Sequence, residues 1–406
     1  MNVIFVEPSF PNNQREFVRA LHAAGANVIG IGERPVDYLD SEVKSWLQDY
    51  VQVRSVVHEP SLLKAVQLIQ SQVWVDRIEA TIEAHIMPVA TIREATGIPG
   101  TSTRTAYLCR DKPAMKEALR EAGIACAQST RAESAQDAHD FAAAVGYPLI
   151  LKPPAGAGAS GTYKVGDAKS LKRVIAECGL ADGHAVAIEE FIEGHEGYID
   201  TLTINGDVRH EFITHYYPNV LEAMRERWIS PQMVTTNRID EPGYAEVRQM
   251  TRDVIRILDI GTSATHMEWF FGPKGLKFSE IGCRPPGVGQ WDVYNAANEF
   301  DLYFEWANAI VRGDTHTRPS RRYAAGMIAL RPDCDGQISG YSGVNAINDR
   351  YGDCIVAARL PDAGTPTQPV EAGYMANAWL RVRHPDYDRL RQILDDIGQT
   401  LKVHAS

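Results

Sequence analysis

Two glutamates on either side of a short turn form the residue pair with the clearest chemical use. Glu268 and Glu280 are equally far from Lys274, which lies between two mainly apolar segments at 265–270 and 276–281. If these segments pair as a symmetrical hairpin, the carboxylates face each other with Cβ atoms about 4.5–5.5 Å apart. Such carboxylates repel unless a cation such as Mg²⁺ lies between them. The spacing predicts a magnesium site; two solvated glutamates, or a register shifted by one residue, are the alternatives.

An arginine follows this hairpin at once, in the run G-C-R-P-P-G at 282–287. A guanidinium held in a rigid turn beside a metal can bind a carboxylate or a phosphoryl oxygen through two hydrogen bonds. A surface ion pair is the alternative for Arg284. His266 shares the strand face of Glu268 by two-residue alternation, so it is predicted to orient a ligand or a metal-bound water.

Two lysines are placed where an anion would be expected. Lys112 lies in the first turn of a predicted helix that Asp111 caps, and Lys152 ends the apolar strand 148–151. A lysine at the end of a buried strand is costly to desolvate unless an anion meets it, and a phosphate would serve. A lysine that extends its ammonium group into solvent is the alternative.

A glycine-rich segment at 156–161 follows Lys152 and matches the pattern G-x-G-x-x-G. A dinucleotide fingerprint requires a helix next, whereas the residues at 162–165, T-Y-K-V, are predicted to form a returning strand. A Walker A sequence and the protein kinase motifs are also missing. The segment is therefore a hairpin loop whose amides could cover a nucleotide's phosphates, or an ordinary glycine-rich turn.

Two adjacent carboxylates, Glu189 and Glu190, end an apolar strand that begins at 186. Because side chains alternate along a strand, these two point to opposite faces, and one of them needs a hydrogen-bond donor. The amino group of an adenine would serve as that donor. Phe191 and Ile192 follow directly, and they would supply apolar walls and backbone groups for the base.

The first hundred residues alternate between strand and helix patterns. Strand-like segments at 3–6, 27–31 and 73–75 are separated by helical patterns at 17–24 and 60–70. This βαβα order predicts a parallel sheet with helices on its faces. The first strand-to-helix turn, E-P-S-F-P-N-N-Q, contains no glycine, so it lacks a dinucleotide fingerprint. The helix that begins at Lys112 is predicted to bury the following face: Met115, Ala118, Leu119 and Ala122.

The length and net charge of the chain limit the classes of protein to which it can belong. The chain has 406 residues, enough for two to four domains, and 41 basic against 52 acidic residues leave a net charge of −11. That balance argues against general nucleic-acid binding and against a basic membrane-surface protein. The six cysteines are scattered without a C-x-x-C pair, and no apolar stretch approaches the ~18 residues of a membrane span. We therefore expect a cytoplasmic protein without nucleic-acid or membrane partners.

Taken together, these motifs resemble the ATP-grasp superfamily, and the resemblance spans nearly the whole chain. They stand in the family's order: R-D-K at 110–112, L-K-P-P at 151–154, the glycine-rich segment, E-E-F-I-E-G-H-E at 189–196, H-M-E at 266–268 and E-I-G-C-R at 280–284. The resemblance implies an α/β ATP-grasp fold in four parts. These are an N-terminal Rossmann-like domain (1–105), a small lid domain (106–185), a large antiparallel domain with the metal site (186–315), and a C-terminal α+β portion packed on it (316–406).

The resemblance also implies a role for each motif residue. ATP phosphates would be bound by Lys112 and Lys152, and covered by Gly158, Ser160 and Gly161. The adenosine would meet the Glu189 carboxylate, the Phe191 and Ile192 backbone, and Glu196 at the ribose. Magnesium, or manganese, would be carried by Glu268 and Glu280. The implied catalytic residues are Arg284 and Lys152, and Arg284 would stabilise an acyl phosphate or a tetrahedral intermediate.

Gly282 departs from the commonest family pattern. Many members read E-I-N-x-R, in which the asparagine is a third metal ligand, whereas this chain has glycine in that position. Other branches of the family, including ligases that make dipeptides, also have a small residue there. The last ninety residues also resemble those ligases more than the D-alanine–D-alanine ligases. The substitution leaves the number of metal ions open.

The resemblance implies a two-step ligase. A carboxylate attacks the γ-phosphate of ATP to give an acyl phosphate and ADP, and an amine then displaces phosphate to give an amide, with dipeptide formation the leading version. Alternatives are a purine-pathway enzyme, a biotin carboxylase, to whose biotinyl-lysine motif A-M-K at 114–116 is similar, and a nucleotide-binding regulatory protein. A homodimer is usual among relatives. Candidate substrate contacts are His215, Tyr217, Arg225, Trp228, His266 and Arg284, and a surface loop is the alternative for the 225–228 segment.

Overall fold

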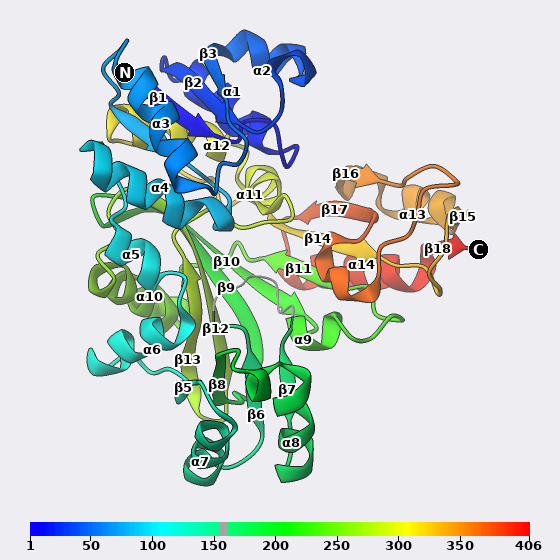
Figure 1. Ribbon diagram of the computed structural model, residues 1–406. Coiled ribbons are helices and arrows are strands. Elements are labelled where there is room, and N and C mark those ends of the chain that lie inside the picture. Colours follow the sequence, from blue (N-terminus) through cyan, green and yellow to red (C-terminus); the bar gives the residue numbers. More distant parts are fainter. Residues whose placement is uncertain (155–160) are drawn as a thin grey trace.

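The N-terminal part of the chain is a parallel sheet covered by helices, as the alternating pattern predicts. The computed structural model describes residues 1–154 and 161–406 (Figure 1). The sheet has the order β3-β2-β1-β4 and parallel pairing. Its strands are β1 (Asn2–Val6), β2 (Asn27–Gly32), β3 (Leu47–Gln52) and β4 (Arg77–Glu79). The helices are α1 (Gln14–Ala23), η1 (Val36–Tyr38), α2 (Ser41–Trp46), α3 (Glu59–Gln70) and α4 (Glu83–Thr96).

The strand predicted at 73–75 is wrong. The fourth strand is β4, and it pairs with β1 so that Val3 lies opposite Arg77. The Trp74 side chain is 81% exposed, so its apolar character does not reflect burial in the sheet. Asp76 accepts a hydrogen bond of 2.7 Å from the amide of Asn2, which brings the chain to the sheet edge just before β4 begins.

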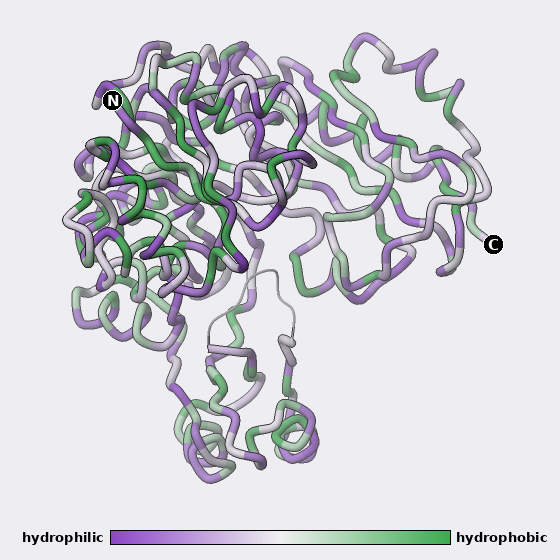
Figure 2. Tube along the Cα trace, turned by 45° about the horizontal axis from the view of Figure 1, so that its top comes forward, coloured by the Kyte–Doolittle hydropathy of each residue, from purple (hydrophilic) through white to green (hydrophobic). Residues whose placement is uncertain are grey.

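The small antiparallel sheet has the order β5-β8-β6-β7 and projects from the rest of the molecule (Figures 1 and 2). Its strands are β5 (Ser129–Ala132), β6 (Leu149–Lys152), β7 (Tyr163–Val165) and β8 (Val186–Glu190). The helices that precede or cover it are α5 (Thr103–Leu108), α6 (Lys112–Glu121), α7 (Ala135–Val145), α8 (Ala168–Glu177) and η2 (Leu180–Asp182). The predicted domain boundary between residues 185 and 186 would assign β8 to the large domain. The structure instead places β8 in the small sheet, between β5 and β6.

The large sheet is antiparallel and has the order β13-β12-β9-β10-β11-β14-β17-β16. Its strands are β9 (His195–Ile204), β10 (Asp207–Tyr217), β11 (Gln232–Thr235), β12 (Ser263–Gly272), β13 (Gly275–Gly282), β14 (Ala324–Leu330), β16 (Ile355–Arg359) and β17 (Ala378–His384). The remaining elements are α9 (Val220–Ala223), η3 (Pro242–Tyr244), α10 (Ala245–Ile257), α11 (Gln290–Asn298), α12 (Leu302–Arg312), β15 (Ile338–Ser342), α13 (Val344–Tyr351), η4 (Gly352–Cys354), η5 (Val370–Met375), α14 (Tyr387–Thr400) and β18 (Lys402–Ala405). The C-terminal ninety residues thus extend this sheet through β14, β16 and β17. None of the helices in the two described ranges is long and apolar enough to cross a membrane.

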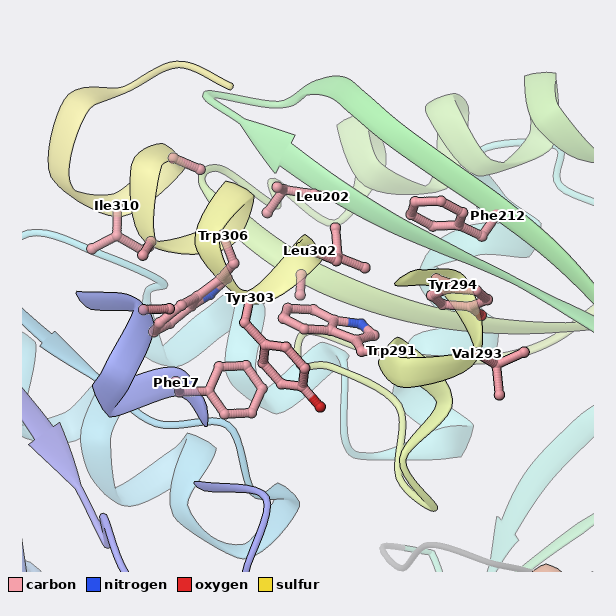
Figure 3. Packing of buried hydrophobic residues seen from close by; sticks show 14 of the residues in the cluster. Phe17, Leu202, Phe212, Trp291, Val293, Tyr294, Leu302, Tyr303, Trp306 and Ile310 are labelled. Carbon is pink, nitrogen blue, oxygen red and sulfur yellow. The ribbon is translucent and has the colours of Figure 1, made fainter. Parts of the chain in front are cut away.

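An aromatic core joins the N-terminal sheet to the large sheet (Figure 3). Phe17 of α1 lies with its ring centroid 5.1 Å from Trp291 of α11, 5.0 Å from Tyr303 and 5.1 Å from Trp306 of α12. Such pairs contribute about 0.5–1.5 kcal/mol each beyond the area that they bury. The core therefore holds the N-terminal part against the helices that follow the β12–β13 hairpin, so that both can line one cavity.

Candidate active site

A cavity of about 870 Å³ lies where the small sheet, the large sheet and the N-terminal part meet. Its volume is within the range of about 300–1,000 Å³ that is usual for small-molecule sites. Most of the residues predicted from the sequence line it: Lys112, Lys152, Glu189, Phe191, Ile192, Glu196, Arg225, His266, Glu268, Glu280 and Arg284. The tertiary structure thus brings together motifs that are as far apart as residues 112 and 284.

The β12–β13 hairpin places the two predicted metal-binding glutamates opposite each other. Glu268 and Glu280 are cross-strand partners, which confirms the predicted register. The hairpin is not symmetrical, however, because Gly272 pairs with Gly275, and that register alone would place Glu268 opposite Ser279. A β-bulge next to Glu268 shifts the register by one residue and restores the carboxylate pair.

The carboxylate pair fits a cation that arrives with a nucleotide. Glu280 Oε2 lies 3.3 Å from the Lys112 ammonium and 4.0 Å from that of Lys152, while Glu268 Oε1 accepts a 3.4 Å hydrogen bond from Tyr216. Within residues 1–154 and 161–406, no three His, Cys, Asp or Glu side chains are grouped to hold a metal ion. Because Mg²⁺ commonly binds one or two carboxylates together with substrate phosphates, this donor set suits it. Magnesium binding here stays a prediction.

Three charged side chains form a buried network at the edge of the small sheet. The Glu189 carboxylate contacts the ammonium groups of both Lys116 and Lys152. Burial alone would raise the pKa of Glu189, but the two ammonium groups outweigh it and hold the pKa at about 2. The predicted contact of Glu189 with an adenine amino group is untested, and this carboxylate already has two cationic partners.

Lys116 is one of the site residues that sequence reasoning missed. It is 1% exposed and stands one helical turn after Lys112 on α6, which Asp111 caps and which begins at Lys112 as predicted. Residues four apart share a helix face, so the spacing from Lys112 was a usable signal. Ala122, predicted to be buried on this helix, is instead exposed.

The segment after β8 carries the residues expected to bind an adenosine. Phe191 lies beneath the Lys164 ammonium, 3.7 Å from the ring centroid, and its backbone amide donates to the Pro148 carbonyl at 3.1 Å. The amide of Phe191 is therefore used within the protein, which leaves its carbonyl as the backbone group to offer a base. Glu196 accepts a 2.7 Å hydrogen bond from the Val220 amide.

The electrostatic setting of Glu196 is unusual for a carboxylate. The side chain is buried beside Glu268, and burial together with that negative charge raises the pKa of Glu196 to about 8. A buried carboxyl of this kind can donate as well as accept a hydrogen bond, which suits a partner with hydroxyl groups. The ribose contact stays a prediction.

The glycine-rich segment joins β6 to β7, which pair antiparallel as expected for a hairpin. This arrangement excludes a Rossmann-type turn, in which a helix would follow the glycines. Gly158 and Ser160 lie outside the described residues. Gly161 has φ +68°, a backbone conformation that favours glycine. A Cβ there would also lie only 3.3 Å from the Pro153 side chain.

His266 faces the cavity, as its alternation with Glu268 predicts. Its Nδ1 lies 2.7 Å from Asp200 Oδ1, and its Nε2 lies 3.6 Å from Glu268 Oε1. Burial lowers the pKa of His266, but the Asp200 carboxylate, with help from Glu268, raises it to about 9. Asp200, which also accepts a hydrogen bond from Tyr294, comes from the neighbouring strand β9 and was not found from the sequence.

Three of the predicted substrate contacts lie elsewhere. His215 and Tyr217 point away from the cavity because they alternate with Tyr216, which lines it. His215 is buried against His195 and Tyr244, at 2.8 and 2.9 Å, and Tyr217 bonds to Tyr387 at 2.9 Å. The third, Trp228, is 80% exposed and does not line the cavity, although its indole N–H donates to Glu226, which does.

Because two neighbouring tyrosines lie on opposite faces of β10, we expect different effects from their substitution. We expect Tyr216→Phe to alter turnover or substrate KM by about 3–10-fold, because it removes a hydroxyl that bonds to Glu268 in the cavity. Tyr217→Phe should leave both constants within about twofold, since its hydroxyl meets Tyr387 on the other face. Steady-state kinetics of the two variants tests this, and a larger effect from Tyr217→Phe would contradict the assignment of faces.

Comparisons with known proteins agree with this arrangement. The family model described as ATP-grasp domain matches residues 117–300. An L-arginine-specific L-amino acid ligase of Bacillus subtilis is 27% identical over 248 residues, which cover 59% of this chain and 59% of that protein. The match thus spans about three fifths of the length of this curated relative.

Solved structures match over the full length of the chain. An L-amino acid ligase from Bacillus licheniformis has a TM-score of 0.78 at 16% identity, covering 100% of this chain and 98% of that one. A phosphoribosylglycinamide synthetase from Anaerococcus prevotii has a TM-score of 0.70 at 14% identity, covering 100% and 99%. At these identities the likeness concerns the fold. The chain therefore has the ATP-grasp fold, its residues 117–300 match the ATP-grasp domain model, and it is similar to L-amino acid ligases.

Proposed function

We propose that this protein is an ATP-dependent ligase that joins a carboxylate to an amine, with two amino acids and a dipeptide product as the leading case. The observation that carries the proposal is the convergence of opposite charges on one cavity. Two lysines, an arginine and a facing pair of glutamates all line it. Phosphoryl transfer depends chiefly on positioning and charge neutralisation, which is what such a set of groups supplies.

In the first step, an oxygen of the substrate carboxylate attacks the γ-phosphorus of ATP, and the bond to the bridging oxygen of ADP breaks. The Lys112 and Lys152 ammonium groups flank Glu280, so they lie where phosphate charge would be neutralised. When bound by Glu268 and Glu280, Mg²⁺ would supply further neutralisation of phosphate oxygens. The products are an acyl phosphate and ADP.

In the second step, the amine nitrogen attacks the acyl carbon, and the tetrahedral intermediate expels phosphate, which leaves with the proton lost by the amine. Arg284 lines the same cavity and presents a guanidinium able to bind the developing oxyanion or the leaving phosphate. Holding both substrates in one enclosed site also lowers the entropic cost of their reaction. Small carboxylates and amines are accordingly the proposed partners.

Two alternatives involve other ATP-dependent reactions. A purine-pathway enzyme is an alternative because a phosphoribosylglycinamide synthetase shares the fold. A carboxylase in which A-M-K at 114–116 carries biotin is disfavoured, because Lys116 is buried and paired with Glu189. A biotinyl-lysine must instead be accessible to the enzyme that modifies it.

The test is turnover with the nucleotide products resolved. The protein is incubated with MgATP and a panel of amino acids, alone and in pairs, while ADP, AMP and phosphate are separated and measured. ADP and phosphate formed only with certain pairs would support the ligase and name its substrates. AMP with pyrophosphate would contradict the acyl phosphate route.

A matched pair of variants locates this turnover. Glu280→Gln is expected to lower ADP formation by about 10²-fold or more, because it removes one of the two facing carboxylates. Glu246→Gln, at an exposed position in the first turn of α10, should keep wild-type turnover within about twofold. Equal rates in the two variants would show that the turnover arises outside the cavity. If the wild type forms no ADP with any pair but still binds nucleotide, the regulatory alternative is favoured.

A further inference from the structure

An ion pair between distant parts of the chain holds the site arginine. Arg284 Nε donates to Glu83 Oε2 at 2.7 Å, across a separation of 201 residues. A second nitrogen of the same guanidinium, Nη1, donates to the Pro285 carbonyl at 2.8 Å. Both ion-paired side chains are mostly buried, at 16% and 24% exposure, and both line the cavity. Two contacts on different nitrogens fix the plane of the guanidinium as well as its position.

Glu83 is itself firmly placed. It is the first residue of α4, where the helix dipole favours a negative charge. Its backbone carbonyl accepts a 2.7 Å hydrogen bond from Arg110. The carboxylate therefore reaches Arg284 from a helix end that is tied both to the N-terminal sheet and to the segment before α6.

Gly282 provides the space for this pair. A Cβ at position 282 would lie 3.5 Å from Glu83 Oε2, and also 3.5 Å from the Cγ of Arg284. An alanine would therefore be in ordinary contact, whereas the outer atoms of a longer side chain would meet the carboxylate or the guanidinium. The Glu83–Arg284 pair thus lies in the space that a longer side chain at position 282 would need.

We propose that Glu83 is a positioning residue that orients the Arg284 guanidinium toward the phosphoryl group, in space that Gly282 leaves free. The inference rests on the proposed function in that it takes Arg284 as the group that binds the transferred phosphoryl or its product phosphate. Nε donates to Glu83 and Nη1 donates to Pro285, and the Arg284 side chain also lines the cavity, where its other N–H groups would meet a phosphoryl oxygen. Glu83 acts through Arg284 and does not itself touch the reacting atoms.

The experiment measures binding of inorganic phosphate to the MgADP complex by calorimetry, which needs no turnover. The comparison is between Glu83→Gln and Glu83→Ala, because both remove the negative charge while only glutamine retains an oxygen that accepts from Arg284 Nε. We expect phosphate to bind about tenfold more weakly to Glu83→Ala than to Glu83→Gln, since a misdirected arginine loses its paired hydrogen bonds. In an Arg284→Ala background, the same two substitutions should differ by less than about twofold.

A matched control is Glu42, whose carboxylate forms an exposed ion pair with Arg15 in the same part of the chain. Glu42→Gln and Glu42→Ala should bind phosphate equally. Equal affinities of the two Glu83 variants, or a difference that persists without Arg284, would overturn the proposal, as would a wild-type MgADP complex that does not bind phosphate. The ligase assignment has its own test: it fails if no acid–amine pair releases ADP. The comparison of phosphate binding between the Glu83 variants can still be made in that case.

Discussion

Replacing Lys152 with methionine is expected to lower the rate of ADP formation by about 10²–10³-fold, the usual cost of removing one preorganised charge from a polar transition state. Lys152 ends β6, and its ammonium group contacts Glu189 and lies 4.0 Å from Glu280. Burial lowers its pKa, but the Glu189 and Glu280 carboxylates outweigh burial and raise it, so the side chain stays charged. Methionine retains much of the apolar volume and removes only the charge.

The effect on turnover must be separated from a general loss of structure. Lys169→Met, at an exposed position in α8 of the same small-sheet region, is the control and should retain turnover within about twofold. Thermal unfolding and nucleotide binding of both variants are measured beside the kinetics. A folded Lys152→Met protein that forms ADP at the wild-type rate would contradict the assignment of this lysine to the phosphates.

Replacing Glu189 with alanine is expected to lower the free energy of unfolding by about 3–5 kcal/mol, the range for breaking a buried ion pair by removing one partner. The carboxylate is 5% exposed and lies between Lys116 and Lys152. Its removal leaves two ammonium groups close together in a largely buried place, which costs desolvation and repulsion at once. Urea unfolding of the protein without nucleotide measures the difference. Added MgATP should return part of the lost stability, because phosphates would replace the carboxylate beside Lys152.

The neighbouring carboxylate is the matched control. Glu190 points to the other face and pairs with Lys274, whose side chain is 69% exposed. Because exposed ion pairs contribute little, Glu190→Ala should cost less than about 1 kcal/mol. Similar decreases in the free energy of unfolding for the two variants would mean that the buried network of Glu189, Lys116 and Lys152 does not stabilise this sheet edge more than an exposed ion pair does.

The stabilising contribution of Glu189 should depend on pH in a defined direction. Its pKa in the folded protein is about 2, below the ordinary value of about 4.3 for a glutamate in an unfolded chain. The contribution is therefore complete above about pH 4.3 and is lost as the pH falls toward the folded-state pKa. The difference in unfolding free energy between the wild type and Glu189→Gln should shrink over that acid range. A difference that grows on acidification would contradict the ion-pair explanation.

Features that depend on local spacing were predictable from the sequence. Equal spacing of Glu268 and Glu280 from Lys274 was enough to predict that the two carboxylates face each other, although a β-bulge, not a symmetrical turn, produces that register. The residues that flank the glycine-rich segment indicated a hairpin, and β6 and β7 form one. These predictions succeed because covalent geometry sets the side-chain periods of strands and helices, whatever the rest of the chain does.

Which strand faces line the cavity, and which distant groups meet there, depends on long-range packing. Alternation separates Tyr216 from its neighbours His215 and Tyr217, but only the packing of the large sheet shows that Tyr216 is the one inside. Lys116 likewise became a site residue because β8 brings Glu189 to its helix. The contact between Glu83 and Arg284 joins residues 201 positions apart, and no local period relates them. Such contacts follow from how sheets and helices pack against one another, which depends on the whole core and not on any one segment.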